Sequence, residues 1–273
     1  MALFIASLNS GSNGNCYYVG NSQDAVLIDA GLSCRDTEKR LLQAALPIDR
    51  VRAIFVSHEH TDHIKGLPGL ANKYNLPVYI TDGTLQHGPH LIRKLSRPFI
   101  ADEPVIVGSL QVIPFTKRHD AADPHSFMVG HEGINAGVFT DIGSTCEKVI
   151  HYFGQCHAAF LEANYDDAML ENGIYPLVLK NRIRGDRGHL SNSQALELFI
   201  RYRPAFMTHL LLSHLSKENN DPELVRRLFL THAGNVEIDI ASRYAPSAVY
   251  AIDQRFKKAP VILRPQQMKL FHD

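Results

Sequence analysis

The chain is organised around the stretch Ser57-His58-Glu59-His60-Thr61-Asp62-His63, which directly follows the apolar run Val51-Arg52-Ala53-Ile54-Phe55-Val56. The apolar run is typical of a buried strand, and a rigid strand would hold the side chains that follow it in place. His58 and His60 can converge on one cation from an extended turn, whereas Asp62 and His63 face a second position. Because imidazole and carboxylate groups suit divalent transition metals, the stretch predicts a site for two metal ions rather than a polar surface loop.

The composition is that of a soluble globular protein. The 273 residues are 45% hydrophobic and 21% charged, which allows a large buried core. Lysine plus arginine equals aspartate plus glutamate, at 28 each. With no overall positive field, a nucleic acid would have to be held by a local patch.

The cysteine pattern and the hydropathy predict a cytoplasmic protein. Cys16, Cys34, Cys146 and Cys156 include no Cys-x-x-Cys pair, and we expect them to be free thiols of a reducing compartment. The apolar stretch 3–8 has no basic region before it and is too short for a signal segment, so a first strand is expected there. No apolar run approaches the roughly 18 residues that span a bilayer, and we expect no membrane association.

Strand and helix patterns alternate along the chain and favour an α/β (α+β) fold. Two mixed halves, each β-rich with flanking helices, fit a four-layer αββα sandwich of two mixed sheets better than one parallel sheet. We expect a single domain over residues 1–273. Expected strands lie at 3–8, 16–20, 24–28, 51–56, 77–80, 105–107, 110–115, 125–130, 134–139, 158–161 and 205–212, and expected helices at 35–46, at 191–202 with Ser191 or Ser193 as N-cap, and from Asp221-Pro222 onward.

The histidine stretch also resembles a known signature. His58-Glu59-His60-Thr61-Asp62-His63 matches the His-x-His-x-Asp-His signature of the metallo-β-lactamase superfamily, whose fold is the αββα sandwich. The resemblance implies that the first two histidines bind one metal ion and that the Asp-His pair binds a second. It further implies a downstream histidine for the first ion, an aspartate that bridges both ions, and a last histidine for the second.

Three downstream residues fit these roles by their position after expected strands. His119 follows the strand 110–115, whereas its rival His125 opens the next strand. Asp141 lies just after the apolar strand 134–139 and precedes a glycine turn. His214 follows the strand 205–212, whereas His209 lies inside it and is expected to be a packed core histidine.

The resemblance therefore implies a dinuclear metal centre. Two cations roughly 3.5–4 Å apart would lower the pKa of a bound water toward about 7 and so supply a nucleophile at neutral pH. Imidazole and carboxylate ligands serve Zn, Mn and Fe alike, so the expected cofactors are two divalent ions of any of these elements. The predicted metal ligands are His58, His60, Asp62, His63, His119, Asp141 and His214.

Four further segments narrow the resemblance to one branch. Segments 7–15, 160–166, 187–192 and 214–220 look like the YycJ (WalJ) branch of the superfamily. That branch is regarded as acting on DNA as exonucleases, and it is similar in site layout to ribonuclease Z, in which a glutamate orients a histidine that protonates the leaving oxygen. Glu162 and His189 match those two positions and, with Asp62, are the predicted catalytic residues. The alternatives are a salt-bridge carboxylate for Glu162 and a surface histidine for His189.

A basic cluster directly precedes His189. It consists of Lys180, Arg182, Arg184 and Arg187. Because arginine side chains suit phosphate oxygens, the cluster is a candidate for substrate phosphate binding. The alternative is a solvated loop and helix end.

These patterns lead to one leading hypothesis and two alternatives. The leading hypothesis is a dinuclear metal-dependent phosphodiesterase that acts as a DNA exonuclease. At 273 residues the chain fits neither the long arm of ribonuclease Z nor the inserted domain of β-CASP nucleases, so its hold on nucleic acid would come from the domain surface or a homo-oligomer. The first alternative, a small-molecule (cyclic or nucleotide) phosphodiesterase, is favoured by the zero net charge. The second is a non-catalytic metal-binding regulatory protein, in which Glu162 and His189 would be redundant.

Overall fold

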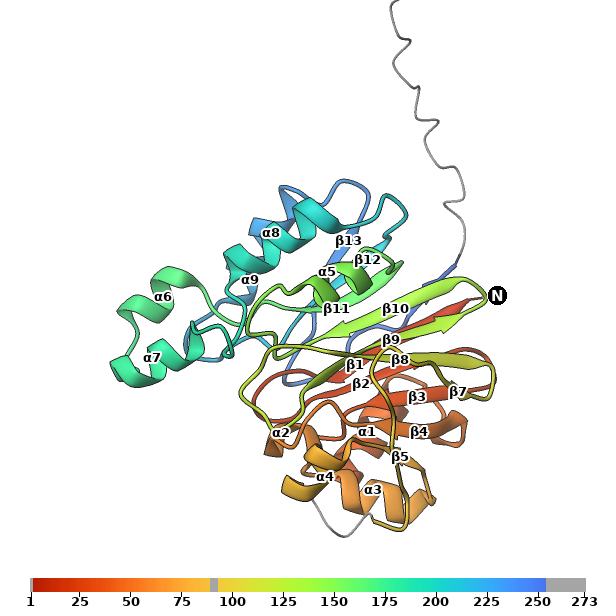
Figure 1. The fold of residues 1–273 in the computed structure, drawn as a ribbon. Helices are drawn as coiled ribbons and strands as arrows, with labels where there is room; N and C mark the ends of the chain where they lie inside the picture. Colours follow the sequence, from red (N-terminus) through yellow and green to blue (C-terminus); the bar gives the residue numbers. More distant parts are fainter. Residues whose placement is uncertain (1, 89–92, 254–273) are drawn as a thin grey trace, which may run out of the picture.

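Two central β-sheets organise the computed structural model, which describes residues 2–88 and 93–253 (Figure 1). Within these ranges the first seven-stranded sheet has the order β14-β1-β2-β3-β4-β5-β6 and the second the order β13-β12-β11-β10-β9-β8-β7. The strands are β1 (Leu3–Asn9), β2 (Cys16–Gly20), β3 (Ala25–Ile28), β4 (Val51–Phe55), β5 (Val78–Tyr79), β6 (Ser96–Arg97), β7 (Val105–Val107), β8 (Leu110–Thr116), β9 (His125–His131), β10 (Ile134–Phe139), β11 (Ala158–Glu162), β12 (His209–Ser213), β13 (Glu237–Ile240) and β14 (Tyr250–Ile252).

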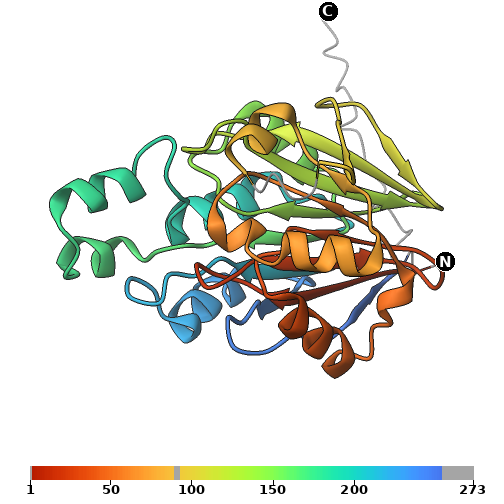
Figure 2. The same cartoon turned by 90° about the horizontal axis from the view of Figure 1, so that it is seen from below.

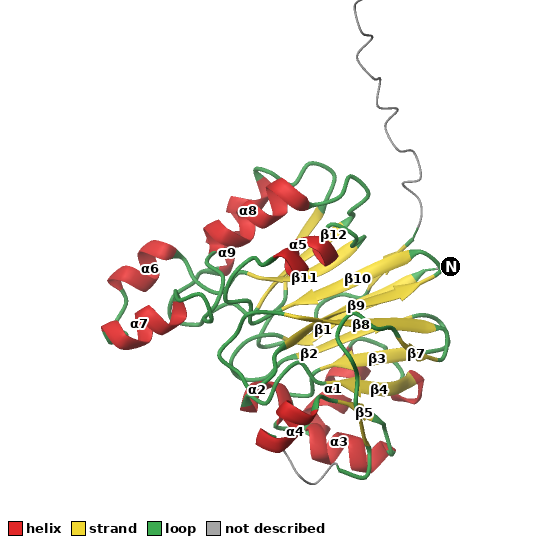
Figure 3. Cartoon of the chain, in the orientation of Figure 1, coloured by secondary structure: helices red, strands yellow, loops and turns green. Residues whose placement is uncertain are grey.

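Helices cover the outer faces of the two sheets (Figure 3). The first sheet is covered by α1 (Cys34–Gln43), α2 (Thr61–Ile64), α3 (Leu67–Tyr74) and α4 (Asp82–His87), and the second by α5 (Glu147–Phe153), α8 (Asn192–Tyr202) and α9 (Pro222–Leu230). Two further helices, α6 (Asp167–Asn172) and α7 (Leu177–Ile183), project together from one end of the sandwich in both views (Figures 1 and 2). The predicted four-layer αββα sandwich is confirmed.

Three buried apolar layers hold the sandwich together. Between the sheets, Phe55, Phe127 and Phe160 pack in one cluster. Side chains of α5, α8 and α9 pack with the outer face of the second sheet, and those of α1 and α3 with the outer face of the first. In β11, Phe160 points into the layer between the sheets and Leu161 into the layer under the helices. A strand buried on both faces requires such a continuous apolar sequence.

Strand direction brings one end of both sheets together. The pairs β3–β4, β10–β11 and β11–β12 are parallel. Strand β8 runs the same way as β10, because both are antiparallel to β9. The carboxyl ends of these strands therefore lie along one edge of each sheet, and the loops that follow them meet there.

Capping residues place two of the helices. Ser191 is the N-cap of α8 and forms a capping box with Gln194, so of the two expected cap residues the structure uses Ser191 rather than Ser193. Asp221 caps α9 by accepting from the backbone N–H of Leu224, and Pro222 occupies the first turn. Both features agree with the sequence-based expectation.

Some expected elements differ in the structure. The strand expected at 205–212 begins only at His209, because the backbone N–H of Met207 donates to the Pro204 carbonyl and forms a turn. His209 is consequently at the strand start, partly buried, with Nε2 3.3 Å from Glu237 Oε2, and is not a packed core histidine. The basic cluster, by contrast, spans the last turn of α7 and the loop after it, in agreement with the loop and helix end that the sequence indicated.

Two expectations concern the whole chain. None of the helices in the described part of the chain combines the length and apolarity needed to span a bilayer. The predicted single domain, 1–273, stays a prediction, because residues 1, 89–92 and 254–273 lie outside the described ranges.

Removal of the Phe160 ring should unfold the sandwich more readily than loss of an exposed side chain. Phe160 is fully buried, and its ring centroid lies 4.9 Å from that of Tyr17. We expect Phe160→Ala to lower the free energy of unfolding by about 3–5 kcal/mol, measured by urea denaturation. Leu42→Ala, at a side chain 81% exposed, should change it by no more than about 0.5 kcal/mol. Equal losses in the two variants would contradict the assignment of Phe160 to the core.

Candidate metal centre

The predicted metal ligands all follow the carboxyl ends of strands. They come from loops and from the short helix α2, which are distant in sequence and which the shared strand direction brings to one edge of the sandwich. His58, His60, Asp62 and His63 follow β4, His119 follows β8, Asp141 follows β10 and His214 follows β12. The structure thus brings all seven of these side chains into one region.

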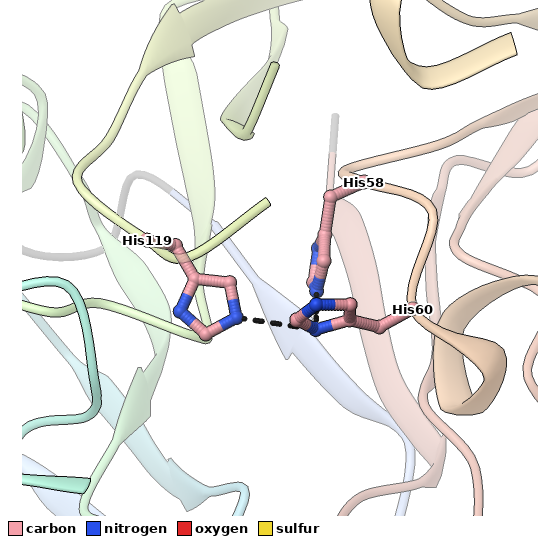
Figure 4. A group of neighbouring side chains, drawn as sticks. All are labelled: His58, His60 and His119. Atoms are coloured by element: carbon pink, nitrogen blue, oxygen red, sulfur yellow. Dashed lines mark hydrogen bonds between the residues drawn. The ribbon is translucent and has the colours of Figure 1, made fainter. Parts of the chain in front are cut away.

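Three histidines form the first group (Figure 4). His58 Nε2 lies 3.1 Å from His60 Nδ1, and His119 Nε2 lies 3.3 Å from the same nitrogen. His58 and His119 are buried. Ring nitrogens from two separate loops therefore converge on one point. This arrangement is suited to a cation that accepts a lone pair from each imidazole.

Asp62, His63 and His214 form the second group. His63 Nε2 and His214 Nε2 each lie 3.5 Å from Asp62 Oδ2. Asp141 lies between the two groups: its Oδ2 is 3.0 Å from His63 Nε2, and its Oδ1 is 3.8 Å from His119 Nε2. Asp141 is thus placed where one carboxylate can serve two cations.

Two buried atoms of this region support metal binding independently of the pattern. Asp141 Oδ2 and His214 Nε2 have no partner in hydrogen-bonding geometry among the described residues, although other charged groups lie near them. A buried polar atom without a partner is costly. Coordination of a cation would satisfy both atoms, and imidazole with carboxylate is a donor set for divalent transition metals. The residues therefore fit a divalent metal.

Three of the histidines also make a contact through Nδ1, the ring nitrogen on the side away from the candidate metal positions. His63 Nδ1 lies 2.7 Å from Oδ2 of the buried Asp29, and His119 Nδ1 lies 3.0 Å from the Gly188 carbonyl oxygen. His214 Nδ1 lies 2.9 Å from Glu162 Oε1. Such partners fix the orientation and tautomer of a metal-binding imidazole.

Sequence reasoning missed Asp29 and Asn15. Asp29 accepts from both the backbone N–H and the hydroxyl of Ser57, at 2.8 Å each. Asn15 donates to Asp62 Oδ2 at 3.0 Å. A signal for Asp29 was present, because it is the first residue after the apolar strand β3, and Asp141 likewise lies two residues after the end of β10. Asn15 lies in a loop whose sequence is equally compatible with a hairpin connection, so its role required coordinates.

Backbone conformation at the site is unusual. Asp29, Asp141 and His214 have φ angles of 62°, 54° and 55°, in the left-handed region that non-glycine residues adopt at a cost. Gly31 permits a close approach, since a Cβ there would lie 1.6 Å from the Asp62 carbonyl oxygen. These loops therefore direct side chains at the site through backbone conformations that are less favourable for residues other than glycine.

Glu162 binds two histidines with one oxygen. Its Oε1 accepts from Nδ1 of His189 at 2.8 Å and from Nδ1 of His214 at 2.9 Å, while Oε2 accepts from the backbone N–H groups of Ile142 and Leu190. Glu162 is fully buried. The predicted contact between Glu162 and His189 is present, and the additional contact with His214 was not predicted.

Electrostatics divides the histidines into two kinds. Burial lowers the pKa of His58 well below its usual value and that of His119 to about 4, so both are neutral. Burial also lowers the pKa of His214, but the charge of Asp141 and the contacts with Asp62 and Glu162 outweigh burial and raise it to about 10. The pKa of His63 is raised for the same kind of reason, chiefly by Asp141 and Asp29 against the effect of burial.

Glu162 stays ionised despite its complete burial. Burial alone would raise the pKa of its carboxyl group, but the charge of His189 and hydrogen bonds from His189 and His214 lower it to about 2. Glu162 is therefore a hydrogen-bond acceptor, and His189 keeps its proton on Nδ1. The second ring nitrogen of His189 is then the one that can exchange protons with a ligand.

A cavity of about 190 Å³ opens onto these groups. His189 and Arg182 line it together with five of the predicted ligands, whereas Lys180, Arg184 and Arg187 do not. Lys180 Nζ donates to the Glu171 carbonyl oxygen at 2.6 Å, and Arg184 pairs with the Glu171 carboxylate at 2.9 Å. The structure thus separates the basic cluster into one residue at the cavity and three outside it.

The αββα sandwich and its two clusters of imidazole and carboxylate groups define a metal-binding protein with the metallo-β-lactamase fold. A family model for the metallo-beta-lactamase superfamily matches residues 10–145. The chain is similar in fold to the metallo-beta-lactamase fold protein YhfI of Bacillus subtilis, with a TM-score of 0.70 at 17% identity over 92% of this chain and 100% of the other.

Two relatives are similar over most of their length. The exodeoxyribonuclease YycJ of Bacillus anthracis is 37% identical over 230 residues, which cover 83% of this chain and 87% of the relative. The exodeoxyribonuclease WalJ of Streptococcus pneumoniae is 30% identical over 239 residues, which cover 85% and 89%. The chain therefore belongs to the YycJ/WalJ family of the metallo-β-lactamase superfamily, and the resemblance inferred from the sequence is confirmed.

Metal binding should compete with protons at the second group. Because an imidazole nitrogen must be deprotonated to bind a cation, and the pKa of His214 is raised to about 10, metal binding near neutral pH must displace protons. We expect Mn²⁺ affinity to fall as the pH is lowered and calorimetric heats to vary with the ionisation enthalpy of the buffer. His214→Gln should release fewer protons, whereas His131→Gln, at a buried histidine that contacts Ser109 instead, should match the wild type. Heats independent of the buffer would contradict this prediction.

Proposed function

We propose that this chain is a dinuclear metal-dependent phosphodiesterase that hydrolyses DNA as an exonuclease. The observation that carries the proposal is the Glu162–His189 pair beside the metal-binding groups: His189 lines the cavity, and the buried Glu162 holds its Nδ1. Two relatives similar over most of the chain are named exodeoxyribonucleases, which supports DNA as the substrate. The cofactors would be two ions of Zn, Mn or Fe.

The seven ligands divide between two ions. His58, His60 and His119 would hold the first, Asp62, His63 and His214 the second, and Asp141 would contact both. When bound, such a pair of ions lowers the pKa of a coordinated water and stabilises the charge that develops on the phosphate.

The protein itself supplies the proton for the leaving group. Glu162 holds His189 through Nδ1, so the opposite ring nitrogen can donate to the alkoxide oxygen as the phosphodiester bond breaks. The His189 side chain is 22% exposed, whereas Glu162 is fully buried. The acid is therefore accessible to substrate, as general acid catalysis requires, while the group that orients it is shielded from water.

A small phosphodiester is a second candidate substrate. The cavity of about 190 Å³ is smaller than most ligand pockets, and the formal net charge is zero. Both features favour a compact ligand over a long polyanion. A metal-binding regulatory protein without catalysis does not explain why His189 faces the cavity with a buried carboxylate, Glu162, behind it.

Cellular context completes the proposal. We place the protein in the cytoplasm, where thiols stay reduced, and Cys16, Cys34, Cys146 and Cys156 are all free. The small cavity and zero net charge make a homo-oligomer a reasonable way to extend the contact with DNA. Gel filtration with light scattering measures this directly.

One assay separates these functions. Protein reconstituted with Mn²⁺ or Zn²⁺ is offered end-labelled duplex DNA, single-stranded DNA, RNA and bis-p-nitrophenyl phosphate. We expect stepwise shortening of DNA from an end. Turnover of bis-p-nitrophenyl phosphate alone would contradict the nuclease proposal and favour the small substrate. A protein with two bound metal ions that cleaves none of the four would contradict catalysis altogether.

Two substitutions test the division of roles. We expect Asp141→Ala to lose both metal and activity, and His189→Ala to keep its metal while its turnover falls about 10²–10⁴-fold, as for loss of a general acid. Metal content is measured by plasma mass spectrometry. His151→Ala, at an exposed histidine of α5, is the matched control and should retain both. Loss of metal from His189→Ala would overturn its assignment as the acid.

A further inference from the structure

One face of α7 lines the cavity of the metal centre. Leu179, Arg182 and Ile183 are among the residues that form the cavity wall. Their spacing of three and four residues places them on the same side of a helix. With α6, α7 projects from the end of the sandwich where the ligands gather (Figures 1 and 2). The projecting pair therefore contributes a wall to the site.

The opposite side of α7 is bound to α6. Lys180 Nζ donates to the Glu171 carbonyl oxygen, and Arg184 pairs with the Glu171 carboxylate. These two cations brace the helix pair and do not line the cavity. They differ from Arg182 in position but not in charge.

Arg182 is the single lysine or arginine among the described residues that line the cavity. Its Nε lies 2.5 Å from Asp120 Oδ2, and Asp120 Oδ1 lies 3.4 Å from His119 Nε2. The guanidinium group is thus held next to the metal-binding histidines by a carboxylate. The Arg182 side chain is 61% exposed, so a ligand can reach it.

We propose that this face of α7 is the nucleotide-recognition wall of the site: Arg182 exchanges Asp120 for a substrate phosphate, and Leu179 and Ile183 contact the adjoining sugar and base. The inference rests on the proposed function, because it assigns a substrate group to the same cavity. The ligand class is a nucleoside phosphate, either free or as the end of a DNA strand.

The chemistry favours exchange over a permanent ion pair. The contact with Asp120 uses Nε, whereas a guanidinium carries five donors and binds phosphate oxygens through two at once. An ion pair exposed to water gains little from its attraction. The Asp120 carboxylate repels a phosphate anion that comes close to it, and a guanidinium that turns from Asp120 to the phosphate offsets this repulsion with two charged hydrogen bonds.

Equilibrium binding of thymidine 5′-monophosphate to the metal-loaded protein, measured by calorimetry, tests the inference without turnover. We expect Arg182→Ala to weaken this binding about tenfold or more, the usual effect of losing a hydrogen bond to a charged group. Arg182→Lys should recover part of the loss. Lys180→Ala and Arg184→Ala, matched in charge, should stay within about twofold of the wild type.

Two further variants distinguish phosphate recognition by Arg182 from an ion pair that only holds α7 in place. If the ion pair only holds α7 in place, Asp120→Asn and Arg182→Ala weaken binding alike. In our proposal their effects have opposite signs, because Asp120→Asn releases Arg182 and removes a repelling charge. Ile183→Ala should weaken binding of thymidine 5′-monophosphate but not of inorganic phosphate, whereas Arg182→Ala weakens both.

The outcomes are independent of the nuclease assay. Thymidine 5′-monophosphate affinity unchanged in Arg182→Ala, or lost equally in Lys180→Ala, would overturn the inference even if DNA is cleaved. Failure to cleave DNA would overturn the nuclease proposal while the binding series still decides the role of Arg182. Metal content and thermal unfolding of each variant show whether a loss of binding reflects loss of the fold or of the metal.

Discussion

The burial of Asp141 among imidazoles is the constraint on which the site depends. A carboxylate removed from water is costly unless opposite charge compensates it. Here His63 and His214 lie close to Asp141, and its Oδ2 has no partner in hydrogen-bonding geometry among the described residues. Protons on these histidines compensate the charge in the metal-free protein, and a cation can replace them. Stability of the region and metal binding therefore use the same groups, as linkage requires.

The sandwich can support such a cluster because its core does not depend on it. Three apolar layers pack the sheets and helices, while the predicted ligands lie in the segments that follow the strands. Two buried carboxylates lie behind the histidines: Asp29 accepts from His63, and Glu162 accepts from His189 and His214. Left-handed backbone at Asp29, Asp141 and His214 shows that loop geometry, rather than strand regularity, aims these side chains.

Much of this architecture could be predicted from the sequence, for identifiable reasons. The signature at 58–63 and the apolar strands before Asp141 and Glu162 indicated the fold and brought all seven candidate ligands to one place, although their binding of metal stays a prediction. The predicted start of β12 was wrong, because Met207 donates to the Pro204 carbonyl and forms a turn. Strand propensity does not detect such a turn. Asn15 and the double contact of Glu162 could not be predicted, since they depend on how separate loops meet. The sequence could not show that only Arg182 of the basic cluster lines the cavity, because charge alone does not tell which side of α7 a residue occupies.

The place of α6 and α7 in the chain has a mechanical consequence. The chain leaves the site at Glu162, forms both projecting helices, and returns at His189, whose ring Glu162 holds at 2.8 Å. The helix pair thus lies in a segment whose two ends are fixed at Glu162 and His189, and this segment contributes none of the predicted metal ligands. If α7 recognises the nucleotide as proposed, replacing this segment with one that keeps the two ends the same distance apart changes which nucleotides are accepted and leaves the predicted metal ligands in place. On this proposal, the segments that carry the predicted ligands form the constant part of the site, and the segment between Glu162 and His189 is the part that can vary.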